Sequence, residues 1–420
     1  MKRRQFLTGL TGATVASASA VSIAKPAIAS ETTTLKMALA WPKNFLGLGE
    51  SSQRLSEGIE RATDGRYKVQ LLGPGEYAVS GNLFNATSQG EIDIYHAVEY
   101  YWEEESKAFN FFATIPFGMT AYEQESWLSN MGGQKLWDQL SARYNIKPFA
   151  AGNTGVQMGG WFNRRIETLT DIRGMRLRIP GMGGDVYKRL GAKLVNIPST
   201  QLVQALNEDR IDGTEWLGPW SDINIGLHKA AKFYHWPGFH EPGTQISLGI
   251  NLDRWKGMEP RTQRIIEICA RAEGQRLLAK FNAENARSIQ ELKALPDIQL
   301  IPYPTIVLDA LGKASGESVA ALSRGGQIEK QIYESFIRAR WQLLQWAKFS
   351  DEAYLLARRL PFSYRRTVSA GEKRILPSKD STPKSVSSSE RITKNIPQFQ
   401  VKVSPSSKKP GSGGFNPFQN

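Results

Sequence analysis

The sequence predicts a mixed α/β fold, and it contains one internal similarity that two lobes would explain. Short apolar runs alternate with segments whose apolar residues recur every three or four positions, a pattern typical of strands connected by helices. Two six-residue segments, Gln89–Ile94 and Glu208–Gly213, also resemble each other, because in each a polar turn ends a predicted helix and Ile-Asp begins the next extended segment. Two related lobes facing a cleft would produce such a similarity, and so would chance. The chain of 420 residues is long enough for two or three domains.

The first third of the chain contains three predicted strands and three predicted helical segments. Gly65 and Gly90 stand where the first two helices are expected to end, since glycine is common just after a helix. The predicted strands are Leu35–Trp41, Tyr67–Leu72 and Ile92–Tyr95. The first predicted helix has Leu48, Leu55, Ile59 and Ala62 on one face and ends near Gly65, and the other two helical segments lie around Leu83–Gln89 and over roughly Tyr122–Tyr144.

The remainder continues this alternation and then becomes helical. The predicted strands are Lys147–Ala151, Val156–Phe162, Met175–Ile179 and Lys193–Ile197. Two long helical runs follow, Glu259–Leu295 and Ile328–Leu360. The first would extend about 50 Å, so we expect it to brace both lobes or to reach a partner subunit.

The N-terminus has the layout of an export signal. Arg3-Arg4 in a basic head, a weakly apolar middle and the Ala-Ile-Ala sequence that ends at Ala29 predict a twin-arginine signal over residues 1–29, cleaved after Ala29. No uncharged apolar stretch in the remainder is long enough to span a bilayer.

The net charge of +13 is concentrated at the two ends of the chain. The N-terminal segment carries about four of these charges and residues 365–420 about eight, which leaves the body nearly neutral. Because the body lacks a strong positive charge, we predict no nucleic-acid partner. Residues 365–420 are rich in Ser, Lys and Pro, and this composition predicts a disordered basic tail. Such a tail is compatible with a solvated extension or with attachment to an anionic surface.

The residue inventory offers little for catalysis. The single Cys269 excludes internal disulfides and clusters of cysteine ligands. The four histidines form no metal-binding pair at helical spacing, and for His235 and His240, which flank Trp-Pro-Gly-Phe, a role in turn packing is favoured. Val186 stands where a dinucleotide-binding fingerprint requires glycine. We therefore predict that the protein is not an enzyme and has no organic cofactor.

Polar residues lie among aromatic ones at the predicted strand ends between Gly152 and Gly243, where α/β proteins form their clefts. Arg176 and Arg178 point to the same face of one strand, and Pro180 places Arg178 at the end of that strand. An Arg fork binds a carboxylate through two charge-assisted hydrogen bonds. A surface ion pair is the alternative, and the more common, fate of an Arg on a strand.

Three further residues in this region, Gln157, Glu215 and Glu241, supply side-chain oxygens. Ligation by oxygen alone suits a hard cation such as sodium or calcium rather than zinc. Spacing alone leaves the alternative open that these residues cap helices or form ordinary ion pairs.

Four separated motifs in this region, in this order, resemble the solute receptors of tripartite ATP-independent periplasmic (TRAP) transporters. The similarity covers roughly residues 31–364 and is greatest to the branch that binds 2-oxo monocarboxylates such as pyruvate. The motifs are GNTGVQMGGWF, RGMRLRIPG, IDGTEW and WPGFHEPG.

The resemblance implies a role for each site residue. Arg178 would bind the substrate carboxylate, and Tyr100 would contact the substrate from the opposing lobe. A sodium or calcium ion that also touches the substrate would be held by Gln157, Glu215, the carbonyl of Trp216 and Glu241. The implied function is a periplasmic receptor that delivers a 2-oxo monocarboxylate to a membrane permease. The same receptor role for lactate with calcium or for an amino acid such as glutamate, and an exported cofactor enzyme, are the alternatives.

The resemblance also implies two lobes that close over the ligand, and a homodimer formed by C-terminal helices. The tail beyond Tyr364 departs from the family pattern. The resulting organisation is an export signal at 1–29, a first lobe at 31–155 and 244–283, a second lobe at 156–243 with parts of 284–327, a C-terminal helix at 328–364 that mediates dimerisation, and the basic tail at 365–420.

Overall fold

The computed structural model describes residues 32–77 and 82–361. The expected export signal and the expected basic tail lie outside the described residues, so both stay predictions. The contacts of the chain divide it after Leu355, and both sheets lie in the part before that point.

The first sheet contains the N-terminal strands and one strand that returns from much later in the chain. Among the described residues it has five strands in the order β2-β1-β3-β10-β4. β1 runs parallel to β2 and β3, whereas β10 is antiparallel to β3 and β4. The strands are β1 Thr33–Leu39, β2 Tyr67–Leu72, β3 Ile94–Ala97, β4 Ile146–Asn153 and β10 Gln245–Asn251, with helices α1 Leu48–Ala62, α2 Leu83–Gln89 and α10 Leu252–Lys256 and the 3-10 turns η1 Glu99–Trp102 and η2 Lys107–Phe112.

The second sheet is built from the middle of the chain. In the part that the structure describes, its six strands have the order β11-β9-β5-β8-β6-β7. The predicted strands are correctly located but shorter than expected, and only Gly160–Phe162 of Val156–Phe162 pairs as β5. The other strands are β6 Arg176–Arg178, β7 Lys193–Leu194, β8 Gly213–Thr214, β9 Phe233–Trp236 and β11 Gln299–Pro302, and the helices are α5 Leu169–Ile172, α6 Gly181–Arg189, α7 Leu202–Asn207, α8 Pro219–Ile225 and α9 Leu227–Ala230, with the 3-10 turn η3 Ser199–Gln201.

Both sheets are covered by apolar side chains on both faces, so each lobe has its own core. In β1, Met37 and Leu39 pack into one cluster and Ala38 into another, because successive side chains of a strand point to opposite faces. In β5, Trp161 and Phe162 divide in the same way between the two clusters of the second sheet.

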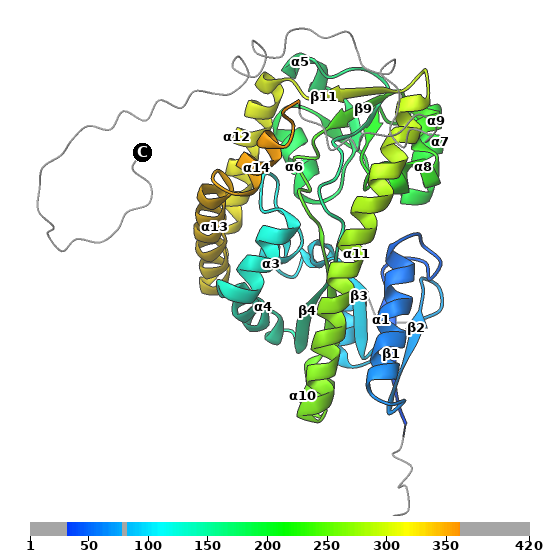
Figure 1. The fold of residues 1–420 in the computed structure, drawn as a ribbon, viewed down its shortest axis with the longest axis vertical. Coiled ribbons are helices and arrows are strands. Elements are labelled where there is room, and N and C mark those ends of the chain that lie inside the picture. Colours follow the sequence, from blue (N-terminus) through cyan, green and yellow to red (C-terminus); the bar gives the residue numbers. More distant parts are fainter. Residues whose placement is uncertain (1–31, 78–81, 362–420) are drawn as a thin grey trace, which may run out of the picture. The chain divides into compact units, whose positions relative to one another are not determined.

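The long helix α11, Pro260–Ala294, belongs to both lobes, which is one of the two arrangements expected from its length. It runs past β4 and α1 and then past α8 (Figure 1). Leu277 and Phe281 are buried in the core of the first sheet, whereas Leu292 is buried in the core of the second. The helix therefore braces the two lobes.

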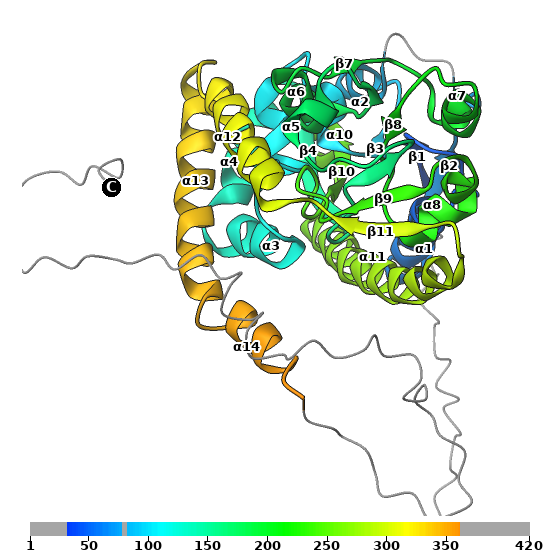
Figure 2. The ribbon, with the colours of Figure 1, turned by 90° about the horizontal axis from the view of Figure 1, so that it is seen from above.

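Two predicted helical runs are each broken in the structure. The segment Tyr122–Tyr144 forms two helices because Gly132 has a φ of 88°, the left-handed region that favours glycine. A Cβ atom on Gly133 would lie only 2.8 Å from the Trp127 ring, so the second helix turns back closely on the first. The run Ile328–Leu360 is interrupted between Lys348 and Ser350. The helices are α3 Ala121–Asn130, α4 Gly133–Ala142, α13 Gln327–Ala347 and α14 Asp351–Ala357, and α12 Thr305–Leu322 precedes α13 (Figure 2).

The two turns that resemble each other in sequence also fold alike. Asp93 Oδ2 accepts a hydrogen bond from the backbone N–H of Lys36 on the neighbouring strand at 2.8 Å. Asp212 Oδ2 accepts the equivalent bond from Arg176 N at 2.7 Å. Each aspartate also pairs with an arginine, Asp93 with Arg254 at 2.9 Å and Asp212 with Arg176 at 2.7 Å. The two lobes therefore use the same device to join a helix to a parallel strand.

Within residues 32–77 and 82–361, none of the helices combines the length and the apolar character needed to cross a membrane.

Candidate functional site

Arg178 is at the end of β6, as predicted, and is largely withdrawn from solvent. Its side chain is 17% exposed, and its Nη1 lies 3.8 Å from Glu215 Oε1. Nε donates a hydrogen bond to the carbonyl of Ile197 at 3.3 Å. The guanidinium carbon is 5.9 Å from the centre of the Trp216 ring. Nη1 is buried and has no hydrogen-bond partner among the described residues, so it is free to bind an acceptor.

Arg176, two residues earlier on the same strand, forms a surface ion pair, which was the alternative considered for Arg178. Its guanidinium forms two hydrogen bonds with Asp212, of 3.1 and 2.7 Å, in a partly exposed ion pair. Leu177 between the two arginines points into the core of the second sheet. Arg176 thus serves the fold, whereas Arg178 faces the candidate site.

Glu215 and Glu241, which are 26 residues apart in the chain, meet in the structure and are both buried. His240 joins them, with Nε2 lying 3.3 Å from Glu215 Oε2. One ligand atom from each of these three residues lies within 4.8 Å of the others. The expectation that His240 only packs a turn is therefore incomplete. His235 does have a packing role, since its ring stacks on Tyr303 at 4.8 Å.

Gln157 is attached to this cluster through its amide nitrogen. Nε2 donates to Glu241 Oε2 at 2.7 Å and to the hydroxyls of Thr154 and Thr244 at 3.1 and 3.2 Å. These three acceptors fix the direction of the amide, and Oε1 is left buried without a hydrogen-bond partner in the described chain. The backbone supports the same contact, because Gln157 N donates to the carbonyl of Glu241 at 3.1 Å.

Two glycines permit the close packing around this cluster. A Cβ atom on Gly238 would lie 2.4 Å from the Gln157 carbonyl oxygen, so only glycine lets this turn approach Gln157. A Cβ atom on Gly183 in α6 would lie 2.8 Å from His240 Cβ. The Trp-Pro-Gly-Phe turn and the N-terminal part of α6 therefore close around the site.

The electrostatics of the cluster are those of buried acids with too few positive partners. Burial, and then the charge of Glu215, raise the pKa of Glu241 to about 7. Burial lowers the pKa of His240, but the hydrogen bond and charge of Glu215 outweigh it, so the net shift is upward. A positive charge next to both carboxylates would be stabilised.

The free polar atoms fit a hard cation and an anion side by side. Gln157 Oε1, Glu215 and Glu241 offer oxygens of the kind that sodium and calcium prefer. The Trp216 carbonyl follows Glu215 directly in the same loop. Arg178 Nη1, which pairs loosely with Glu215 at 3.8 Å and has no hydrogen-bond partner among the described residues, is the donor available to an anion. These oxygens and this guanidinium donor therefore suit a bound cation with a carboxylate next to it.

The first lobe contributes aromatic rings to the same place. Tyr100 in η1 lies beside the N-terminus of α6, since a Cβ atom on Gly181 would be 3.9 Å from Tyr100 Cγ. Burial, and then the charge of Glu241, raise the pKa of Tyr100 well above its ordinary value. The ring of Phe45 meets the Trp216 ring edge-on at 6.0 Å. Tyr100 was predicted from sequence and Phe45 was not.

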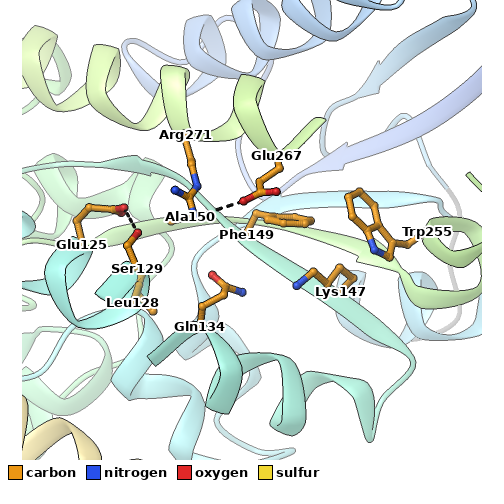
Figure 3. A pocket seen from close by; sticks show the side chains of 10 residues that line it. All are labelled: Glu125, Leu128, Ser129, Gln134, Lys147, Phe149, Ala150, Trp255, Glu267 and Arg271. Carbon is orange, nitrogen blue, oxygen red and sulfur yellow. Dashed lines mark hydrogen bonds and ion pairs between the residues drawn. The ribbon is translucent and has the colours of Figure 1, made fainter. Parts of the chain in front are cut away.

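A separate cavity of about 220 Å³ lies on the first lobe between α3, α4, β4 and α11 (Figure 3). Phe149 and Trp255 form part of its wall, and Arg271 pairs with Glu267 at 3.3 Å at its edge. None of the predicted site residues lines this cavity.

Two α/β lobes braced by one helix, with a buried cluster of charged groups where they meet, define a two-lobed solute-binding protein. The model of the bacterial extracellular solute-binding proteins of family 7 matches residues 40–324, more than half of the chain. The chain belongs to this family and is a substrate-binding receptor of a TRAP transporter.

Among its relatives is a monocarboxylate 2-oxoacid-binding periplasmic protein of Nostoc sp. (strain PCC 7120). The two are 31% identical over 363 residues, which is 84% of this chain and 98% of the relative.

Two solved TRAP periplasmic solute-binding proteins are similar in fold and sequence. One, from Colwellia psychrerythraea, has bound calcium and pyruvate; it is 31% identical with a TM-score of 0.75, covering 78% of this chain and 100% of that one. The other, from Pseudoalteromonas atlantica, has bound sodium and pyruvate; it is 31% identical with a TM-score of 0.73, covering 78% and 99%.

Proposed function

We propose that this receptor binds a 2-oxo monocarboxylate of the size of pyruvate together with a sodium or calcium ion, and delivers it to the permease subunits of a TRAP transporter. The observation that carries the proposal is a pair of buried atoms that have no hydrogen-bond partner in the chain as described. One is the donor Nη1 of Arg178, which lies beside Glu215, and the other is the acceptor Oε1 of Gln157, whose amide nitrogen donates to Glu241. The ligands named for the relatives support the choice of substrate class.

The proposed binding reaction exchanges water for protein groups. A free carboxylate is strongly hydrated, so a closed site must replace its hydration shell. Arg178 Nη1 would donate a charge-assisted hydrogen bond to the ligand carboxylate. The cation would be held by Gln157, Glu215, the Trp216 carbonyl and Glu241, and it would supply positive charge next to both glutamates and the ligand oxygens.

We further propose the lobe boundaries given above, with closure of the first lobe over the ligand. Strand β10 returns to the first sheet and β11 joins the second, which supports a division near residues 155 and 244. Tyr100 and Phe45 from the first lobe already lie close to residues of the second. Closure would place them over the ligand and exclude water.

A thermal-shift panel tests the proposal. The chelator-treated protein would be heated with pyruvate, lactate or glutamate, each with sodium, with calcium and with chelator. Pyruvate is expected to raise the melting temperature by a few degrees only when a cation is present, because ligand at a hundredfold excess over Kd stabilises by about 2.7 kcal/mol. A larger shift with lactate or glutamate would reassign the ligand. Ligand recovered in chemically altered form would show an enzyme instead.

We also propose a periplasmic location reached by the twin-arginine route, with cleavage after Ala29. Arg3-Arg4 and the Ala-Ile-Ala sequence support it. N-terminal sequencing of the exported protein tests the cleavage site. Replacing both arginines with lysine should abolish export by this route, and undiminished export would contradict the assignment.

Finally, we propose a homodimer formed through α13 and α14. One face of α13 packs on the first lobe through Ile332 and Phe336, whereas Trp346 and Phe349 are 65% and 81% exposed. Large exposed apolar side chains gathered in one segment mark an interaction surface. Light scattering of the purified protein should give the mass of two chains, and Phe349→Glu should give one. A wild-type protein of monomeric mass would contradict the proposal.

A further inference from the structure

Asp222 in α8 is a buried carboxyl that the proposed ligand contacts do not use. Its side chain is 1% exposed and accepts four hydrogen bonds. Oδ1 accepts from the backbone N–H groups of Leu217 and Gly218 at 3.2 and 3.0 Å. Oδ2 accepts from Trp161 Nε1 at 2.9 Å and from the Tyr234 hydroxyl at 2.7 Å.

These four donors belong to two different parts of the second lobe. Leu217 and Gly218 directly follow Glu215 and Trp216, which hold the proposed cation. Trp161 and Tyr234 are on the adjacent strands β5 and β9, fully buried and stacked with ring centres 3.9 Å apart. The carboxyl of Asp222 therefore ties the loop of the proposed cation ligands to the sheet.

The end of the same loop is held from its other side by α11. Asn285 Oδ1 accepts a hydrogen bond from Trp220 N at 3.0 Å. A Cβ atom on Gly218 would lie 3.2 Å from the Asn285 amide, so the loop and the helix are in close contact. The loop is thus fixed at its C-terminal end, immediately after the two proposed ligands.

We propose that Asp222 is a positioning residue for the cation, because it sets the path of the backbone that presents the Glu215 side chain and the Trp216 carbonyl. This inference rests on the proposed function. Only a carboxyl offers acceptors on both of its arms, and an asparagine would turn an NH₂ group toward two donors. Groups that orient metal ligands affect metal affinity about 10- to 100-fold when they are removed.

The test is a calcium titration of the full mature protein carrying Asp222→Asn. Pyruvate binding by the chelator-treated protein would be followed by calorimetry at increasing calcium chloride. The calcium concentration for half-maximal binding is expected to rise about 10- to 100-fold. At saturating calcium, the affinity for pyruvate should return toward that of the unchanged protein. Without calcium, the Leu217 and Gly218 amides should exchange hydrogen faster.

A matched control is Asp93→Asn. Asp93 is also buried and also accepts a backbone N–H bond, from Lys36, but it lies in the first sheet away from the proposed ligands. This control should lower the melting temperature and leave the calcium midpoint unchanged. An Asp222→Asn protein that behaves in the same way would overturn the inference and leave Asp222 as a structural residue.

A second variant decides the question if Asp222→Asn does not fold. Tyr234→Phe removes one donor from Oδ2 and keeps the ring, and a rise of a few-fold in the calcium midpoint is expected. An unchanged midpoint would overturn the inference. Failure of the proposed function gives a different result, since the unchanged protein would then bind pyruvate without any cation, or not at all.

Discussion

The two lobes place a glutamate and an aromatic residue at comparable points but surround them differently. After Asp93 the chain follows β3 and then presents Glu99 and Tyr100, and after Asp212 it follows β8 and then presents Glu215 and Trp216. Both glutamates are buried. Glu215 has Arg178 and His240 beside it. The groups that act on Glu99 are neutral, namely Ser247, Tyr95 and Trp137.

This difference assigns distinct tasks to the two lobes. Burial raises the pKa of Glu99 to about 7, so near neutrality its carboxyl holds a proton for much of the time. It accepts a hydrogen bond from the Tyr95 hydroxyl at 2.8 Å and anchors the turn that carries Tyr100. The second lobe instead places Arg178 and His240 beside its glutamate. Under the proposed function, the first lobe would cover the ligand and the second would supply the electrostatic interactions.

The largest expected effect comes from removing the guanidinium of the second lobe. Arg178→Ala should weaken pyruvate binding by about 3 kcal/mol or more, at least a hundredfold in Kd, because the ligand carboxylate loses its charged partner. Calorimetry at saturating cation measures it. Arg176→Ala is the matched control on the same strand face and should leave Kd nearly unchanged. Equal effects of the two variants would contradict the assignment.

Glu99 in the first lobe should make the free energy of unfolding depend on pH. Because the pKa of Glu99 is about 7 in the folded protein and its ordinary value is 4.5, the native state binds the proton more tightly than the unfolded chain does. Its contribution is fully present below pH 4.5 and is lost as the pH rises through 7, up to about 3 kcal/mol. Glu99→Gln should lack this loss.

Urea unfolding of the unchanged protein and of Glu99→Gln at pH 5 and pH 8, with chelator, measures that difference. All other titrating groups are shared, so the change in the free energy of unfolding between the two pH values isolates Glu99. Parallel pH profiles would show that Glu99 is ionised in the folded protein, and the contrast between the lobes would then disappear.

A smaller effect is expected from Glu215→Gln, which removes one negative charge from the proposed cation site. The cation concentration for half-maximal pyruvate binding should rise about 30-fold, or about 2 kcal/mol, since the amide keeps one oxygen but not the charge. Titration with calcium measures this shift. A cation requirement that does not change would show that Glu215 pairs only with Arg178 and His240.

The smallest expected effect concerns the aromatic contact between the lobes. Phe45→Leu removes the edge-on contact of Phe45 with Trp216, and such pairs contribute about 0.5–1.5 kcal/mol. Pyruvate affinity should fall about fivefold with an unchanged cation midpoint. An effect on the cation midpoint instead would mean that Phe45 shapes the cation ligands rather than the cover.

The sequence located β1 to β7 and the long helix α11, because these depend on local periodicity, but it named none of the strands β8 to β11. Strand lengths and the two helix breaks depend on tertiary packing, such as the contact of Gly133 with Trp127, which no local pattern reveals. Residues Arg178, Gln157, Glu215 and Glu241 were found through motifs, and the structure brings all four together. Asp222 was missed because its partner Trp161 lies 61 residues away and its own surroundings in sequence are ordinary. His240 was not predicted as a member of the charged cluster, although its position next to Glu241 in the sequence was a signal that could have included it.

A crystal structure of the mature protein with pyruvate and calcium tests the central claim most directly. We expect a pyruvate carboxylate oxygen about 2.7–2.9 Å from Arg178 Nη1, and calcium about 2.3–2.6 Å from oxygens of Gln157, Glu215 and Glu241. Pyruvate bound elsewhere, with Arg178 facing only Glu215 and no cation between the two glutamates, would contradict the account.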